Sequence, residues 1–245
     1  MAINVDTVYK TVLLILNQQQ RGYMTPDEFN RVGTQVQLNI FEKYADDLNQ
    51  QYRMPQNDTE YANRVKNIEE NLQFFQRLGT TTGTNPFTLV PATTTYTLSN
   101  GDPDVVIDTI YRIGTVYSAG IQLSQYSQRS EITQLLLSPL TQPTTNFPVY
   151  LYENNLVYVY PTAIQTGITF SYLKTPVNVV WNYAAGGLGQ FLYVANGSRN
   201  FELNITEQTN VVTRILAYAG IIINDPTIIQ VASQQIQAEE QNSKT

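Results

Sequence analysis

The sequence offers little material for a catalytic or metal site, because it contains no histidine and no cysteine. Serine triads, cysteine proteases and zinc sites with imidazole or thiolate ligands are therefore excluded, which leaves carboxylate chemistry. Asp102, Asp104 and Asp108 follow one another at short spacings, and three such carboxylates could hold Ca²⁺. The segment NGDPD is also typical of a turn that leads into a strand, and we favour that interpretation.

The other carboxylates do not form a catalytic pair. Asp46–Asp47 and Glu69–Glu70 are neighbours on predicted helices, where adjacent side chains point about 100° apart and cannot share a substrate. Glu153 has no second carboxylate nearby in the sequence with which to act as a glycosidase pair. The glycine-rich run at 184–191 lacks the lysine of a phosphate loop, which favours a turn. We therefore expect no enzymatic activity, no cofactor and no metal.

The composition favours a surface that contacts other proteins. Of the 245 residues, 42% are hydrophobic and only 14% are charged, whereas about a quarter of an ordinary soluble domain is charged. Amide, threonine and tyrosine side chains replace the charge, and another protein can cover such a surface without desolvating many ions. The 17 tyrosines suit either an interface or a tyrosine-rich β core. The net charge of −6 argues against a nucleic-acid clamp, which needs a clustered basic face.

Nothing in the sequence predicts secretion or a membrane span. Without cysteine there is no disulfide framework, and no apolar run approaches the ~18 residues that a span needs. Asp6 and Lys10 interrupt the N-terminal apolar segment, unlike a signal peptide. We interpret the N-x-S/T matches at Asn57, Asn196 and Asn204 as turn and cap residues. We expect a soluble protein, made in the cytoplasm, with no membrane contact.

The N-terminal zone, residues 1–79, has the periodicity of helices. Thr25 is the predicted N-cap, Pro26 the first helical residue, and Glu28 stands three residues after the cap, which together form a capping box. Apolar residues at spacings of three and four then predict one amphipathic helix of about 28 residues, which Pro55 ends. The members of this stripe are Phe29, Val32, Val36, Ile40, Tyr44 and Leu48.

A further helix before residue 79 and a C-terminal helical zone are predicted by the same kind of pattern. Apolar residues that alternate spacings of four and three predict a helix closed by Gly79 and packed antiparallel on its neighbour. They are Tyr61, Val65, Ile68, Leu72 and Phe75. Near the C-terminus, Thr206 is the predicted cap of a helix that ends at Gly220. Asp225-Pro226 then starts a last helix, which becomes wholly polar by Glu239.

Between the helical zones, residues 80–200 change to the alternation of strands. The longest predicted strand is 105–119. A short helix near 130–138, capped by Ser130, interrupts the strands. Asn154-Asn155 joins two tyrosine-rich runs, and because asparagine tolerates positive φ, this is the clearest predicted hairpin.

These zones predict an α+β fold. The helices of residues 1–79 and 201–245 close into one bundle, and residues 80–200 form an inserted antiparallel β domain.

Several short segments of the sequence form a recognisable set. Two stretches in the predicted N-terminal helices are YMTPDEFNR at 23–31 and QLNIFEKY at 37–44. The remaining segments are DDLN at 46–49, SPL at 138–140, PVYLY at 148–152, VYVYP at 157–161, YLKTPVNVVW at 172–181, FEL at 201–203 and ILAYAGI at 215–221. Together they resemble the ring proteins, or adaptors, that connect head to tail in short-tailed bacteriophages, and among these the ring proteins of crAss-like phages.

The resemblance implies a virion structural protein at the head-to-tail junction. It implies a homo-oligomeric ring of twelve copies that lies beneath the portal protein and continues the DNA channel, with DNA passing through without sequence-specific binding. Other tail ring or nozzle proteins are implied partners. The C-terminal segments of such adaptors dock on the portal, and here that position belongs to Ile228, Ile229, Gln230, Ala232, Gln234 and Ile236. The alternatives are another tail component, such as a second ring or a nozzle, and a glycan-binding module that uses the tyrosine-rich sheet.

Overall fold

A computed structural model describes residues 2–18, 23–53, 59–97, 102–126, 128–187, 189–223 and 230–238. The fold is α+β, as the sequence predicts. The chain forms two compact units, each with its own core. The helical unit comprises Met1–Phe74, Thr95–Val105 and Pro176–Thr245, and the sheet unit comprises Phe75–Thr94 and Val106–Thr175. The division expected from the sequence, 1–79 plus 201–245 against 80–200, stays a prediction.

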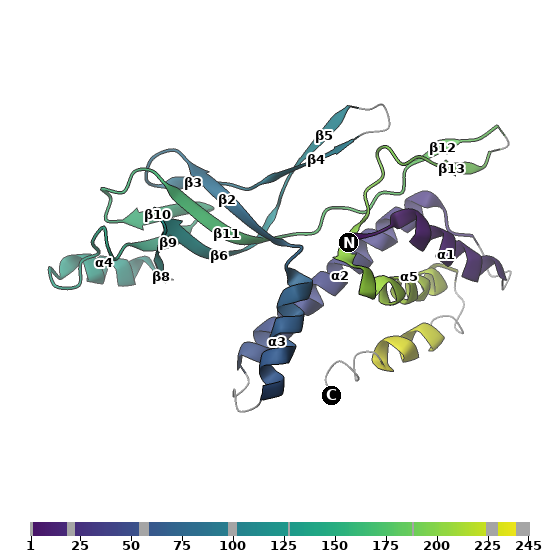
Figure 1. The fold of residues 1–245 in the computed structure, drawn as a ribbon, viewed down its shortest axis with the longest axis horizontal. Helices are drawn as coiled ribbons and strands as arrows, with labels where there is room; N and C mark the ends of the chain where they lie inside the picture. Colours follow the sequence, from purple (N-terminus) through teal and green to yellow (C-terminus); the bar gives the residue numbers. More distant parts are fainter. Residues whose placement is uncertain are drawn as a thin grey trace. The chain divides into compact units, whose positions relative to one another are not determined.

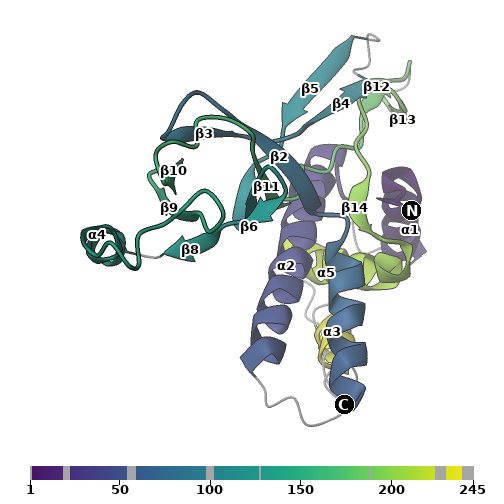
Figure 2. The same ribbon diagram turned by 60° about the vertical axis from the view of Figure 1, so that its left-hand side comes forward.

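The helical unit is built around a long helix, α2 (Pro26–Arg53), as Figures 1 and 2 show. The helices α3 (Thr59–Leu72) and α5 (Gln208–Ile223) pack against α2, and α1 (Val5–Gln18) packs against α5. A two-stranded sheet pairs β1 (Ala2–Ile3) with β14 (Phe201–Asn204). The buried side chains at the centre of this unit include Val8, Val12, Leu16, Phe29, Val36, Ile40, Phe41, Phe201, Leu203, Val211 and Ile215.

The start of α2 confirms the predicted capping box. The backbone N–H of Thr25 donates to Glu28 Oε2 at 2.9 Å, and the N–H of Glu28 donates to Thr25 Oγ1 at 3.4 Å. The hydroxyl of Thr25 also donates to Glu28 Oε2, at 2.8 Å. The two donations from Thr25 to this carboxylate, first from its backbone N–H and then from its hydroxyl, lower the pKa of Glu28 because they stabilise the charged form. The helix has 28 residues, as expected. Pro55, predicted to end it, lies outside the described residues, as do Asn57 and Asp225-Pro226.

The predicted ends of two other helices are wrong. The helix α3 ends at Leu72, and Gly79 lies in a strand, β2 (Gln76–Thr82). A Cβ atom at residue 79 would collide with the ring of Phe170, so this glycine allows close strand packing and does not close a helix. The helix α5 runs past the buried Gly220 to Ile223.

The cap before α5 also differs from the prediction. The predicted cap is Thr206, but the capping residue is Asn204. Its side-chain oxygen accepts a hydrogen bond from the backbone N–H of Thr206 at 3.4 Å. It caps the short 3-10 helix η1 (Ile205–Glu207), which leads directly into α5. Asparagine is the better cap here because its side-chain carbonyl reaches the backbone two residues ahead.

The sheet unit is an eight-stranded sheet in the order β7-β6-β11-β2-β3-β10-β9-β8 (Figure 1). Its other strands are β3 (Phe87–Val90), β6 (Ile110–Ser118), β7 (Ile121–Gln122), β8 (Ser124–Tyr126), β9 (Val149–Glu153), β10 (Leu156–Tyr160) and β11 (Ile168–Lys174). The pairs are antiparallel except for β8 with β9. One buried cluster holds the sheet, and its members include Phe87, Val116, Tyr150, Val157, Val159 and Phe170.

The hairpin β9–β10 confirms the prediction for Asn154-Asn155. Leu156 pairs with Glu153, and both asparagines have positive φ, 50° and 62°, as a tight hairpin turn requires. The predicted strand 105–119 is instead two strands, because β5 (Pro103–Ile107) ends before Asp108 and β6 begins at Ile110.

Asp108 interrupts the predicted strand because it is buried and has partners away from its own strand. Its N–H donates to Ala92 O at 3.0 Å, and its carboxylate accepts from Tyr172 OH at 3.0 Å. The ammonium of Lys174, also fully buried, lies 3.8 Å from the other carboxylate oxygen. This buried polar cluster fixes the chain between β5 and β6.

The short helix inside the sheet unit, α4 (Arg129–Leu137), begins one residue earlier than predicted. Its N-cap is Gln128, which makes no side-chain cap hydrogen bond. Ser130, the predicted cap, lies in the first turn, where its hydroxyl donates to Gln128 Oε1 at 3.3 Å. Its buried side chain is that of Ile132, and the helix contacts β8. Two further ribbons, β4 (Thr93–Thr97) with β5 and β12 (Tyr183–Ala185) with β13 (Phe191–Tyr193), complete the described strands.

Candidate contact surfaces

The carboxylates considered for calcium have other partners. Asp104 forms an ion pair with Arg199, whose guanidinium also lies 5.0 Å from the ring centroid of Tyr96. Asp108 accepts a hydrogen bond from the hydroxyl of Tyr172, as described above. Across the described ranges, no group of three or more metal-binding side chains is found.

Glu153, considered as a glycosidase carboxylate, is bound by arginine. Arg129 Nε donates to Glu153 Oε2 at 3.0 Å, and the same guanidinium lies 5.0 Å from the ring centroid of Tyr158. The arginine therefore links the start of α4 to the β9–β10 hairpin. Both charged side chains are about half exposed, so this link lies at the surface.

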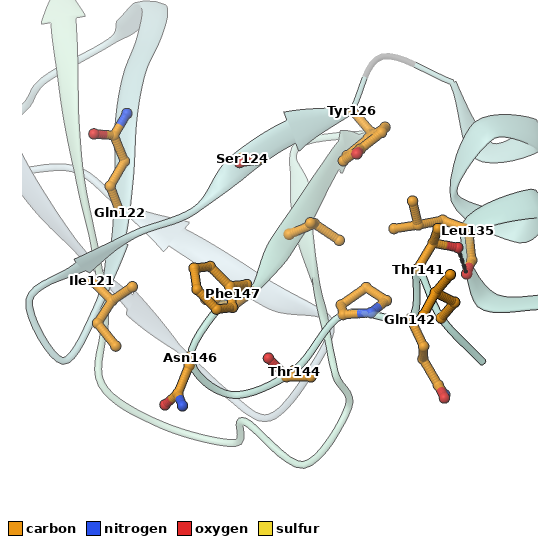
Figure 3. Close-up of a pocket in the computed structure, with 14 residues that line it drawn as sticks. Ile121, Gln122, Ser124, Tyr126, Leu135, Thr141, Gln142, Thr144, Asn146 and Phe147 are labelled. Atoms are coloured by element: carbon orange, nitrogen blue, oxygen red, sulfur yellow. Dashed lines mark hydrogen bonds between the residues drawn. The ribbon is translucent and has the colours of Figure 1, made fainter. Parts of the chain in front are cut away.

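A groove of about 610 Å³ opens at the β8 end of the sheet unit (Figure 3). It lies between the loop after α4 and the strands β7 to β9. In Figure 3, Ile121 and Phe147 lie on one side of the view and Leu135 and Thr141 on the other. Among the residues that the structure describes, no charged side chain lines it: the lining residues are Ile121, Gln122, Ser124, Tyr126, Leu135, Leu140, Thr141, Gln142, Pro143, Thr144, Asn146, Phe147, Pro148 and Val149.

The rim of this groove is strongly exposed and apolar. Leu140 is 95% exposed and Phe147 is 80% exposed, which is unusual for side chains of this size. Hydrogen bonds nevertheless brace the loop that carries them. The hydroxyl of Thr141 donates to Leu135 O at 3.2 Å, and the N–H of Phe147 donates to Thr144 O at 3.1 Å. The apolar groups are therefore held at the surface by the fold.

A second apolar surface is the hairpin β12–β13, which extends away from the helices of its own unit in both ribbon views (Figures 1 and 2). Leu192 is 51% exposed, and Phe191 is exposed as well. The turn closes with a hydrogen bond of 2.7 Å from Gly186 N–H to Gln190 O, which fits the turn predicted for the glycine-rich run. The hairpin therefore presents the apolar side chains of Phe191 and Leu192 on its strand β13.

Trp181 anchors the base of this hairpin. Its buried indole lies 4.4 Å from the ring of Tyr9 and 6.0 Å from that of Tyr183, measured between centroids. The indole N–H donates to Asp6 Oδ1 at 3.1 Å, and Asn30 accepts from the backbone N–H of Trp181 at 2.7 Å. The hairpin is thus rooted in α1 and α2, which limits its freedom to move.

The predicted portal-docking segment is described only from residue 230. Residues 230–238 are helical, while Ile228 and Ile229 lie outside the described residues. Ala232 is buried and Ile236 is partly buried, whereas Gln230 and Gln234 are exposed. The structure therefore splits the predicted set into a covered apolar side and an exposed polar side. The exposed side also contains Val231, which sequence reasoning did not include.

The model of one protein family, described as SU10 adaptor protein, matches residues 26–184, more than half of the chain. The chain belongs to the SU10 adaptor protein family. The match begins at the first residue of α2 and covers the groove and Trp181. No curated protein matches the sequence.

Membership of the SU10 adaptor family makes the protein a structural component of the phage head-to-tail junction, where it contacts other proteins of that junction. In the described part of the chain, no helix has the length and apolarity to cross a membrane.

The sequence did not lead us to predict contact surfaces at the groove and the hairpin. It does contain a pattern that points to them, because residues 132–152 and 175–198 contain no charged side chain although each run includes several large apolar ones. The sequence did not show that the fold exposes these apolar groups.

Proposed function

We propose that this SU10 adaptor family member forms a closed ring of twelve copies between the portal protein and the tail, and that the ring continues the DNA channel. The observation that carries the proposal is the family match over residues 26–184. The uncharged groove and hairpin support it, since surfaces with few ions to desolvate suit contacts between identical copies. The finer likeness to crAss-like ring proteins is part of this proposal.

In this role the protein is not an enzyme and binds no cofactor. DNA passes through the lumen without sequence-specific binding, which agrees with a net charge of −6 that repels the phosphate backbone. A closed ring requires heterologous contacts, in which one face of each copy meets a different face of the next.

The segment 228–236 is proposed to dock on the portal. Of its described part, Gln230, Val231 and Gln234 are exposed for this contact, while Ala232 and Ile236 support the helix from the covered side. Changing Val231 to Asp is then expected to weaken portal binding and to leave the ring intact.

Imaging of the head-to-tail vertex of the particle tests the proposal. We expect a twelve-copy ring of this chain in direct contact with the portal. Cross-linking in intact particles separates the alternatives: links to tail proteins without links to the portal would assign the chain to a second ring or a nozzle. A vertex in which this chain forms no ring would refute the proposal.

A further inference from the structure

The groove of the sheet unit restricts what can occupy it. Its rim carries Leu140 and Phe147, and its lining in the described part of the chain contains no charged side chain. An occupant with an ion at the contact would lose hydration and gain no opposite charge in return. The occupant must therefore be uncharged, must bring apolar side chains, and must be narrow enough to enter a groove of about 610 Å³.

The chain itself contains a segment with these properties in its other unit. The hairpin β12–β13 lies within the uncharged run 175–198. It presents Phe191 and Leu192 to solvent on a two-stranded ribbon, and Trp181 holds its base. Because its two strands are already paired with each other, docking the ribbon costs little conformational entropy.

Charge disfavours most other surfaces of the same unit. By sequence, the helical unit contains 17 acidic and ten basic residues, whereas the sheet unit contains three acidic and four basic ones. A neutral groove that met the acidic helices of a neighbouring copy would bury ions without partners. The hairpin avoids this cost, and a sheet unit with little net charge does not repel the acidic unit that carries the hairpin.

The strand β8 provides a further point of attachment. It is the last strand in the order of the eight-stranded sheet, so its outer edge pairs with no other described strand. Ser124 and Tyr126 of β8 line the groove. A ribbon that enters the groove therefore lies where backbone pairing can add to the apolar contact.

We propose that the hairpin β12–β13 of one copy inserts into the groove of the next copy, with Leu192 against Leu140 and Phe147. Because hairpin and groove are two different surfaces of the chain, the contact is heterologous, and such a contact forms a ring when its rotation closes. The inference rests on the ring proposed above and names its interface.

Two substitutions and a matched control test the contact by analytical ultracentrifugation. Leu140→Asp places a charge on the rim of the groove, and Leu192→Asp places a charge on the hairpin. Each should weaken self-association at least about tenfold, because an ion would enter an apolar contact. The control, Leu14→Asp, adds the same charge at a leucine on α1 that is 59% exposed and should assemble as the unmodified protein does. Circular dichroism checks that all three variants fold.

Mixing the two defective variants is the sharper measurement. Leu192→Asp retains its groove and Leu140→Asp retains its hairpin, so one complementary contact remains. At a concentration at which each variant alone is monomeric, the mixture should form a one-to-one dimer that grows no further. An isologous contact, in which each surface meets its own copy, predicts no such dimer and would overturn the proposal.

Because the chain has no cysteine of its own, a disulfide between two introduced cysteines can be detected without background from other thiols. In particles or assembled rings, Leu140→Cys and Leu192→Cys in one chain should give a ladder of disulfide-linked multimers that stops at the copy number of the ring. Each single variant should give no ladder.

The outcomes separate this inference from the ring proposal. If the unmodified protein forms no ring in particles, both fail. If rings form and both aspartate variants assemble normally, the interface is wrong and the ring stands. If Leu140→Asp assembles normally but no longer joins the portal or the tail, the groove binds another virion protein, and the inference is overturned.

Discussion

Replacement of Lys174 by methionine tests the buried polar cluster of the sheet unit. The ammonium of Lys174 lies 3.8 Å from Asp108 Oδ1, and both side chains are fully buried. Asp108 Oδ1 has no hydrogen-bond partner among the described residues, while Oδ2 accepts from Tyr172 OH at 3.0 Å. We infer that the ammonium compensates the carboxylate charge. Lys174→Met keeps most of the apolar volume and removes the ammonium, with its charge and its N–H donors.

The expected loss of stability is about 3 kcal/mol. Removal of one partner of a buried ion pair costs about 3 to 5 kcal/mol, since the other charge stays buried without compensation. We choose the lower value for two reasons. Tyr172 still donates to Asp108, and the separation of 3.8 Å is longer than a good hydrogen bond.

Amide hydrogen exchange measures this loss of stability at single N–H groups, so it can be restricted to the sheet unit. The informative N–H groups are those of Asp108, which donates to Ala92 O, and Thr175, which donates to Thr109 O at 2.8 Å. A loss of about 3 kcal/mol accelerates their exchange roughly a hundredfold.

The control for this measurement is Lys66→Met. Lys66 lies 4.0 Å from Glu70 in an exposed pair on α3, and its loss should change stability by less than about 0.5 kcal/mol. Adding Asp108→Asn to Lys174→Met should restore part of the protection by removing the remaining charge. An exchange rate in Lys174→Met that matches the control would show that the ammonium compensates nothing, and the reasoning would be wrong.

Three further predictions concern single features. Thr25→Ala should cost about 1 kcal/mol in thermal or urea unfolding because the capping box is lost, and Thr25→Ser should cost much less; equal losses would exclude the hydroxyl as the cause. Gly79→Ala should cost about 1 to 3 kcal/mol, because its Cβ meets the ring of Phe170; adding Phe170→Leu should recover part of the loss, and a neutral Gly79→Ala would contradict the close packing. Burial raises the pKa of Tyr172 to about 12, above the value near 10 of an unfolded tyrosine. The native state then keeps a proton that the unfolded chain releases, so this contribution is complete below about pH 10 and declines as the pH rises towards 12. Alkaline unfolding of Tyr172→Phe should show a shallower decline, and an unchanged decline would assign it to other groups.

Local patterns predicted part of this fold well. The capping box at Thr25 and Glu28 and the turn at Asn154-Asn155 depend on hydrogen bonds and φ angles within a few residues, so the sequence contains the complete cause. The 28 residues of α2 followed from its apolar stripe for the same reason.

The wrong predictions at Gly79 and Asp108 concern positions whose structure depends on residues far away in the sequence. Gly79 has the position of a helix-ending glycine, but the ring of Phe170, far along the chain, places it in a strand. Asp108 interrupts an apolar run because Tyr172 and Lys174 offer buried partners. Neither partner can be inferred from the spacing of neighbouring residues.

The sequence alone determined the α+β class, the main helix boundaries at Thr25 and Pro26, and the lack of imidazole and thiolate chemistry, because these depend on composition and on interactions within a few residues. The tertiary structure alone decided which uncharged segments face solvent. Leu140 and Val157 both belong to apolar stretches, yet the first is 95% exposed and the second is buried, because only the path of the sheet determines which apolar side chains find neighbours in their own chain and which are left for another.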